Sequence, residues 1–213
     1  TIRLQLGPVG TIADQAPYPI NLESQIADAK ITANGTVNNP LKPDGYQFTI
    51  TANGPELKSL TSLVPVPVLA GEKLPALGPY IVSFKLQGTS DTASLADIDI
   101  RIGQKSLAQV QANGSVLDAF HGKEVDLAVQ IRGDELKQLI GLAPFPDPFP
   151  GTSSLGPFDL AARIKDKQGF FSLSEISLQA GTEKLALIKA RGKINNALEA
   201  DGIDLRVLAE GPE

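Results

Sequence analysis

Apolar and polar residues alternate along much of the chain, which is the pattern of β-strands with one apolar and one polar face. The alternation is regular over 46–53, 95–102, 110–116 and 125–132. Over 95–102 the alternation assigns the isoleucines to the apolar face. It assigns Leu95 to the polar face, together with Asp97, Asp99 and Arg101. The chain is therefore predicted to be mainly β, with its strands in an antiparallel sheet.

Two short helices interrupt the predicted strands, near 55–63 and near 134–141. Each follows a glycine, and Pro55 suits a first helical position because its missing N–H would be unpaired there. Acidic residues follow each glycine, where they favour the positive end of a helix. Proline-rich stretches come next, over 64–68 and 144–150, and are predicted to be extended surface loops.

The chain also resembles itself at a fixed spacing, which is typical of repeat proteins. The segment ITANGTV recurs as VQANGSV and as IKARGKI, and their glycines are 79 and 78 residues apart, at Gly35, Gly114 and Gly192. Other blocks keep this spacing: GPELKSL beginning at Gly54 recurs as GDELKQL beginning at Gly133.

This spacing predicts tandem units with defined boundaries. We expect the end of a preceding unit at 1–34, complete units at 35–113 and 114–191, and the start of a further, truncated unit at 192–213. The units would form one long, curved antiparallel sheet, a β-groove whose concave face is apolar.

The apolar sheet face has two interpretations. It is either an ordinary core, covered by a second layer, or an open groove floor that contacts lipid acyl chains. The residues expected to form that floor are Phe48, Ile50, Ile98, Ile100, Val110, Leu127, Val129, Ile188 and Leu205.

Composition narrows the possible chemistry. The net charge of −5 argues against a nucleic-acid partner, which requires clustered Lys and Arg. There is no cysteine, and His121, in a predicted turn, is the single histidine, so no metal site, catalytic site or cofactor is expected. The paired carboxylates Asp97 and Asp99 are interpreted as a solvated strand face. The chain is not expected to be an enzyme.

The order of three short motifs resembles the AsmA-like family of Gram-negative envelope proteins. The motifs are the acidic helix GDELKQL, the segment LPALGPY that ends at Tyr80, and a strand that ends at Gly103 and leads through a polar turn to Gly114. The resemblance covers most of the chain. Each motif is short, so the order and spacing carry the likeness.

This resemblance implies a function in lipid transport or outer-membrane homeostasis. Members of the family are anchored in the inner membrane and extend into the periplasm, where repeated β-units form an apolar groove for phospholipid. For this chain the resemblance implies a periplasmic location. It also implies contact with the inner and outer membranes through flanking regions, and other envelope proteins as partners.

A structural or adhesive β-repeat module of the cell envelope is the alternative function. Such a module would also have repeats, no cysteine and no catalytic residues. Lipid bound to the purified protein would distinguish the two functions.

Overall fold

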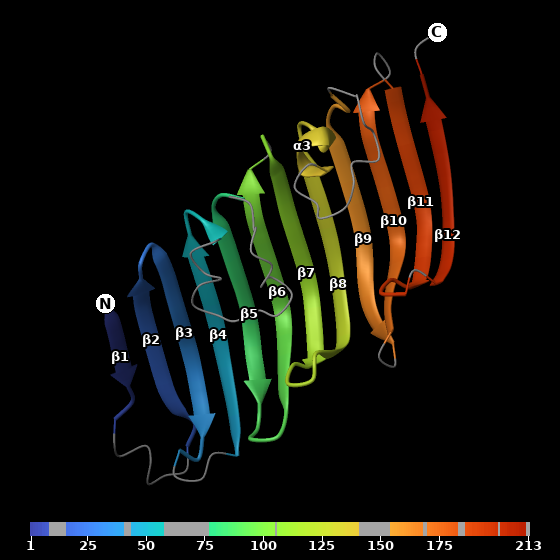
Figure 1. Ribbon diagram of the computed structural model, residues 1–213. Helices are drawn as coiled ribbons and strands as arrows, with labels where there is room; N and C mark the ends of the chain where they lie inside the picture. The colour runs from blue at the N-terminus through green and yellow to red at the C-terminus, as the bar shows by residue number, and fades with distance from the viewer. Residues whose placement is uncertain are drawn as a thin grey trace.

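The computed structural model contains one open antiparallel sheet of twelve strands (Figure 1). The structure describes residues 1–8, 16–40, 44–57, 77–104, 106–140, 154–167, 170–182, 186–199 and 201–211. The strand order is β1 to β12, so every strand pairs with its neighbours in sequence. The predicted mainly β, antiparallel fold is confirmed.

The strands are mostly long, and one short helix is described among them. The strands are β1 (Ile2–Leu6), β2 (Tyr18–Ile26), β3 (Ala29–Asn38), β4 (Gly45–Gly54), β5 (Tyr80–Gly88), β6 (Ala93–Gln104), β7 (Ala108–Asp118), β8 (Lys123–Gly133), β9 (Phe158–Lys167), β10 (Phe170–Thr182), β11 (Ala186–Asn196) and β12 (Asp201–Glu210). The helix is α3 (Leu136–Ile140), between β8 and β9.

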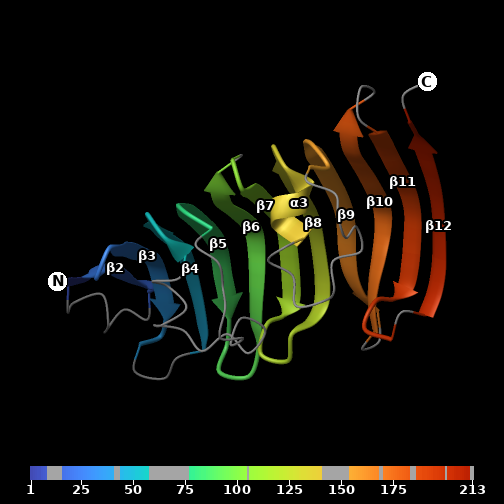
Figure 2. The same ribbon diagram turned by 45° about the horizontal axis from the view of Figure 1, so that its top comes forward.

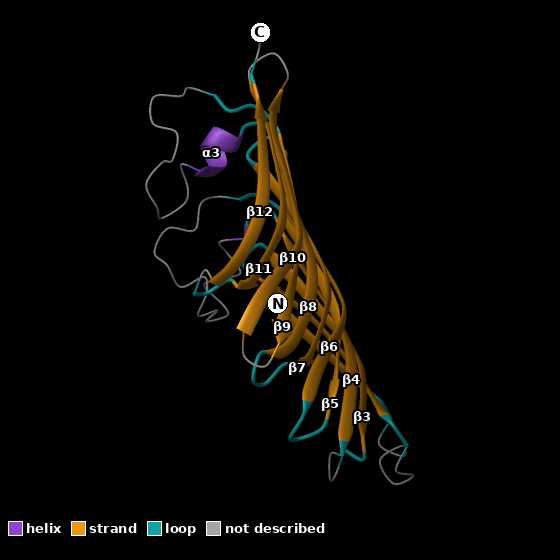
Figure 3. Ribbon diagram, turned by 90° about the vertical axis from the view of Figure 1, so that its right-hand side faces the viewer, coloured by secondary structure: helices purple, strands orange, loops and turns teal. Residues whose placement is uncertain are grey.

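The strands lie side by side in chain order, with β1 at one edge and β12 at the other (Figure 2). Seen nearly edge-on, the sheet twists, and α3 lies on one of its two sides (Figure 3). Because each connection joins neighbouring antiparallel strands, the fold needs no crossover.

The helix predicted near 134–141 is observed as α3. Most of the helix predicted near 55–63 lies outside the described residues, as do the proline-rich stretches 64–68 and 144–150. Those three expectations remain predictions.

Two β-bulges change the alternation within strands. In β6 the register shifts between Leu95 and Ile98, and Asp97 has a φ of 51°. In β10 it shifts between Leu173 and Ile176, and the φ of Glu175 is 53°. An extra residue in one strand reverses the alternation beyond it.

The bulge in β6 overturns one prediction. Leu95 pairs with Leu86 of β5 and with Val116 of β7, so it lies on the same face as Ile98. The alternation had assigned it to the polar face, which was wrong. Simple alternation fails here because two residues of β6, instead of one, separate successive apolar positions.

Seven of the buried residues form two clusters on one face, toward one end of the strands. One cluster contains Ala29, Ala52, Leu57 and Tyr80, with Ile31, Leu77, Val82 and Ile102 packed against it. The other contains Ala108, Phe158 and Ala180, with Ile131, Leu136 and Leu178 packed against it.

Members of the two clusters correspond at the spacing found in the sequence. Leu57 and Leu136 are 79 residues apart, and the aromatic rings of Tyr80 and Phe158 are 78 apart. The bulge residues Asp97 and Glu175 are also 78 apart. The boundaries of the predicted units stay a prediction, but the same side-chain contacts recur at the predicted interval.

Gly114 of β7 lies close against the backbone of β8. A Cβ atom there would lie 1.9 Å from the Asp126 carbonyl oxygen, and the φ of Gly114, 155°, is one that side chains rarely adopt. Gly192 has the same φ and the same 1.9 Å approach, to Asp204. Glycine is therefore required at this repeated position, because any side chain there would collide with the backbone of the adjacent strand.

We expect Gly114→Ala to lower the free energy of unfolding by more than about 2 kcal/mol, because the strands must separate to admit the methyl group. Urea denaturation measures the loss. Gly122→Ala is the control: Gly122 also has a positive φ, 62°, but no atom lies within 4 Å of its Cβ position. Its expected cost is about 1 kcal/mol. Equal losses would show that the close approach does not matter.

Candidate functional site: the apolar face of the sheet

One face of the sheet carries apolar side chains on every strand from β1 to β12, and we call it the apolar face. Residues paired across antiparallel strands point to the same side. Ile100 of β6 pairs with Ala112 of β7, which pairs with Val129 of β8, which pairs with Ala162 of β9. The row continues toward β1, where Val82, Ala52, Ile31, Ser24 and Ile2 pair in succession.

A second row runs parallel to the first. In it Ile98 pairs with Gly114, Gly114 with Leu127, and Leu127 with Ile164. Beyond β9 the same row passes through Leu173, Ile194 and Ile203 to the other edge. The apolar face therefore includes side chains from β1 to β12.

The strand register places all nine predicted floor residues on this face. Ile98 is buried and Leu205, on the edge strand β12, is exposed. The other seven are half-buried: Phe48, Ile50, Ile100, Val110, Leu127, Val129 and Ile188. Their contact with lipid stays a prediction.

The sequence reasoning missed several members of the apolar face. Leu95 was misplaced because of the bulge, and Leu173 lies beside the equivalent bulge in β10. Leu4 and Leu22, paired between β1 and β2, were also missed. Alternation along β2 could have identified Leu22, whereas no simple alternation identifies a residue that lies across a bulge.

The start of α3 covers one end of the apolar face. Leu136 packs against the cluster formed by Ala108, Phe158 and Ala180. Leu57 packs in the same way on the cluster around Tyr80. In the part of the chain that the structure describes, no second sheet lies against the apolar face.

Hydrogen bonds fix the start of α3 to the segment before β9. The carboxylate of Glu135 accepts bonds from the backbone N–H groups of Leu155 and Gly156, at 2.8 and 3.1 Å, and from the hydroxyl of Ser154. The Leu136 N–H donates to the Gly156 carbonyl oxygen at 2.9 Å. The Ser154 hydroxyl and these amides lower the pKa of Glu135. A similar, longer bond joins Gly78 N–H to the Glu56 carboxylate.

The opposite face of the sheet is mostly polar. Lys85 Nζ lies 2.7 Å from an Asp97 oxygen, and Arg101 Nη2 lies 2.8 Å from an Asp99 oxygen. The two carboxylates considered as a possible acid–base pair are thus each bound to a separate cation. The cation contacts fit the solvated strand face expected for them.

The densest ionic contacts on the polar face surround Asp126. Arg163 donates two hydrogen bonds to its carboxylate, from Nε at 2.7 Å and from Nη2 at 2.9 Å, and Lys165 Nζ lies 3.3 Å away. Hydrogen bonding from Arg163, reinforced by Lys165, lowers the pKa of Asp126 to about 2. These contacts join β8 to β9 on the side opposite the apolar face.

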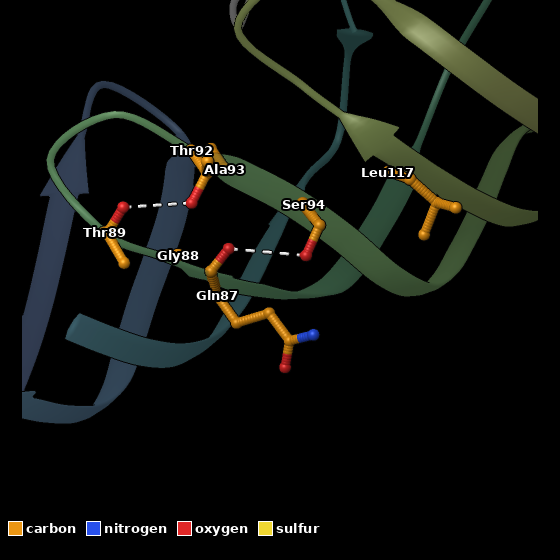
Figure 4. Close-up of a pocket in the computed structure, with 7 residues that line it drawn as sticks. All are labelled: Gln87, Gly88, Thr89, Thr92, Ala93, Ser94 and Leu117. Carbon is orange, nitrogen blue, oxygen red and sulfur yellow. Dashed lines mark hydrogen bonds between the residues drawn. The ribbon is translucent and has the colours of Figure 1, made fainter.

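The hollow shown in Figure 4 is small, about 360 Å³, and lies at the turn between β5 and β6. It is lined by Gln87, Gly88, Thr89, Thr92, Ala93, Ser94 and Leu117. Three of these are short polar residues. The Thr89 and Thr92 hydroxyls are hydrogen-bonded to each other, and the Ser94 hydroxyl donates to the Gln87 carbonyl oxygen. These bonds hold the turn in place.

His121 is exposed in the turn after β7, where its Nδ1 lies 2.9 Å from each Asp118 carboxylate oxygen. Among the described residues there is no group of three or more His, Asp or Glu side chains placed to hold a metal ion. Helices of the described segments are all too short to span a bilayer.

No protein-family model matches the chain, and comparison with curated proteins and with solved structures finds no match either.

We expect the stabilising effect of Asp126 to depend on pH. Its pKa is lower in the folded protein than the value of about 3.9 in an unfolded chain. Its contribution is therefore present above about pH 4 and is lost as the pH falls toward 2. Asp126→Asn should lower the free energy of unfolding by up to about 1 kcal/mol at pH 7, because the pair is partly exposed.

Urea denaturation at pH 7 and pH 3 tests this expectation. The difference between Asp126→Asn and the unaltered protein should shrink at pH 3. Asp204→Asn, at the corresponding position of the exposed strand β12, is the control and should have a smaller effect at pH 7. A difference for Asp126→Asn that is constant with pH would contradict the ionic explanation.

Proposed function

We propose that the apolar face binds the acyl chains of phospholipids and shields them from water. The observation that carries this proposal is the apolar face itself. Its two rows together include side chains from β1 to β12, and no second sheet lies against them among the described residues. Contiguous apolar patches larger than a few hundred Å² mark binding sites on soluble proteins.

The energetics suit an acyl chain. The face offers many aliphatic side chains and few polar groups, so it selects for apolar surface and not for a particular headgroup. Each methylene that moves from water onto such a surface gains about 0.8 kcal/mol. A lipid headgroup would remain beyond the face, in water.

The half-buried state of Ile100 and Val129 also supports binding. In a sealed core such residues would be fully buried, since protein interiors are close-packed. Here neighbouring side chains in the sheet shield their sides while their outer surfaces stay accessible. The two short helix starts cover only one end of the strands.

The wider role follows from the resemblance to AsmA-like proteins. In this proposal the chain is a periplasmic segment whose curved units form a groove with a concave apolar floor. Phospholipid is the cargo, and flanking regions reach the inner and outer membranes. The order and spacing of the acidic helix, the LPALGPY segment and the glycine strand support this assignment.

We expect Val129→Asp to abolish phospholipid co-purification while leaving the fold largely intact. A charge on an open face stays hydrated, whereas a charge in a sealed core costs several kcal/mol. The measurements are mass spectrometry of lipid extracted from the purified protein and far-UV circular dichroism. Ile100→Asp, in the same row, should behave in the same way.

Ala128→Asp is the matched control. Ala128 is the next residue of β8, lies on the polar face and pairs with Arg163, so a carboxylate there is compatible with its surroundings. Its lipid content should equal that of the unaltered protein. Unfolding of Val129→Asp would show that the face is a closed core, and an unaltered protein without lipid would favour the structural module.

A further inference from the structure

The end of the sheet away from the buried clusters exposes large apolar side chains, and we call it the turn end. The clusters lie around Tyr80 and Phe158, where β5 and β9 begin, whereas the other ends of these strands lead into the turns at the turn end. Outside the edge strands β1 and β12, six large apolar residues of the described chain are exposed. Four of the six lie in or beside turns at the turn end: Leu117, Phe120, Phe170 and Leu198.

Two of these residues occupy the same place in turns that are built alike. Phe120 follows Ala119 in the turn between β7 and β8, and Leu198 follows Ala197 in the turn between β11 and β12, 78 residues later. The N–H of Ala119 donates to the Ala93 carbonyl oxygen at 2.8 Å. The N–H of Ala197 donates to the carbonyl oxygen of the corresponding residue of β10 at 2.7 Å. Each turn is thus tied to the hairpin before it.

A second hydrogen bond closes each of the two turns. The Asp118 side chain accepts a bond from the His121 N–H at 3.2 Å, and the Asn196 side chain accepts one from the Glu199 N–H at 3.4 Å. The exposed apolar residue lies between the two bonded residues in both cases. The sequence contains the same arrangement once more, since NPLK at 39–42 corresponds to DAFH at 118–121 and NALE at 196–199. Leu41, the corresponding apolar residue, lies outside the described residues.

The exposure of Phe120 does not depend on an edge of the sheet. Its turn joins two inner strands, with β6 on one side and β9 on the other, and the side chain is still 57% exposed. Single apolar residues scattered over a surface need no explanation. Here the apolar residue recurs together with the hydrogen bonds that position it, so the fold holds it in water at a fixed place.

We propose that the turn end docks on a phospholipid bilayer, with Phe120 and Leu198 inserted between the lipid headgroups. The turns lie along one edge of the sheet (Figure 1). Strands are about 4.8 Å apart, so two turns separated by four strands place their apolar residues about 19 Å from each other. Polar residues lie between them. A bilayer accepts apolar points at any spacing along a line, whereas a single pocket of a partner protein does not extend that far.

The charges at the turn end favour a zwitterionic bilayer. The turn between β7 and β8 carries both signs, at Asp118 and Lys123, and the turn between β11 and β12 carries the acids Glu199 and Asp201. Anionic lipid is repelled by these acids and by the net charge of −5. Binding therefore comes from the transfer of apolar side chains out of water, and it should change little with salt concentration.

The position of the turn end connects this contact with the apolar face. Leu57 and Leu136 cover the opposite end of the strands, so the described residues leave the face uncovered toward the turns. A bilayer at the turn end brings acyl chains to the uncovered part of the face. This transfer alone rests on the proposed function, whereas docking depends on the turns.

Flotation with phosphatidylcholine vesicles at low and high salt tests the docking. A variant carrying Phe120→Ser and Leu198→Ser should raise the Kd for vesicles at least about tenfold, because two apolar side chains no longer leave water. Ile81→Thr is the matched control. Ile81 is 52% exposed but lies at the start of β5, at the opposite end of the strands, so its Kd should equal that of the unaltered protein.

Fluorescence gives an independent measurement, since the chain has no tryptophan. The emission of Phe120→Trp should shift to shorter wavelength with vesicles and be quenched by brominated phosphatidylcholine, and the emission of Ile81→Trp should not change. Circular dichroism verifies that each variant is folded. An unaltered protein that does not bind vesicles, an unchanged Kd for the double variant, or an unshifted emission of Phe120→Trp would overturn the proposal.

The apolar face and the turn end can be tested separately. Val129→Asp leaves the turns intact and should bind vesicles with the Kd of the unaltered protein. Vesicle binding by an unaltered protein that carries no co-purifying lipid would support docking and count against the proposed function alone.

Discussion

The backbone hydrogen-bond ladder between consecutive strands is the interaction on which the rest of this structure depends. Twelve strands pair in chain order, and among the described residues no second sheet packs on them. Tyr80 is the one large side chain there with less than 2% exposure. The sheet is therefore stabilised mainly within its own plane, by the ladder, by cross-strand side-chain contacts and by ion pairs such as Asp126–Arg163.

The ladder also determines the candidate site. Because paired residues share a face, the strand register carries apolar rows from strand to strand, and the two rows together include side chains from β1 to β12. The bulges at Asp97 and Glu175 keep apolar side chains on this face: in each, two residues separate successive apolar side chains, so that Leu95 and Ile98 lie on the same side. Lys85 holds Asp97 on the polar face at 2.7 Å. The bulges in β6 and β10 thus keep apolar side chains of these strands on the apolar face.

The same register links the interior of the sheet to its edges. The starts of the helices, through Leu57 and Leu136, shield one end of the strands and leave most of the apolar face uncovered by described residues. The proposal of acyl-chain binding rests on this uncovered part of the apolar face.

The sequence by itself determined the strands, the helix at 134–141 and the spacing of the repeated segments, because alternation and glycine positions reflect local backbone geometry. Alternation also indicated that the nine candidate floor residues share one face of the sheet, and the strand register places them on one face. The sequence could not place Leu95, since a bulge depends on how the neighbouring strands pair. Nor could it decide between a covered core and an open face. Alternation reports which side of a strand is apolar, and only the tertiary structure shows what lies against that side.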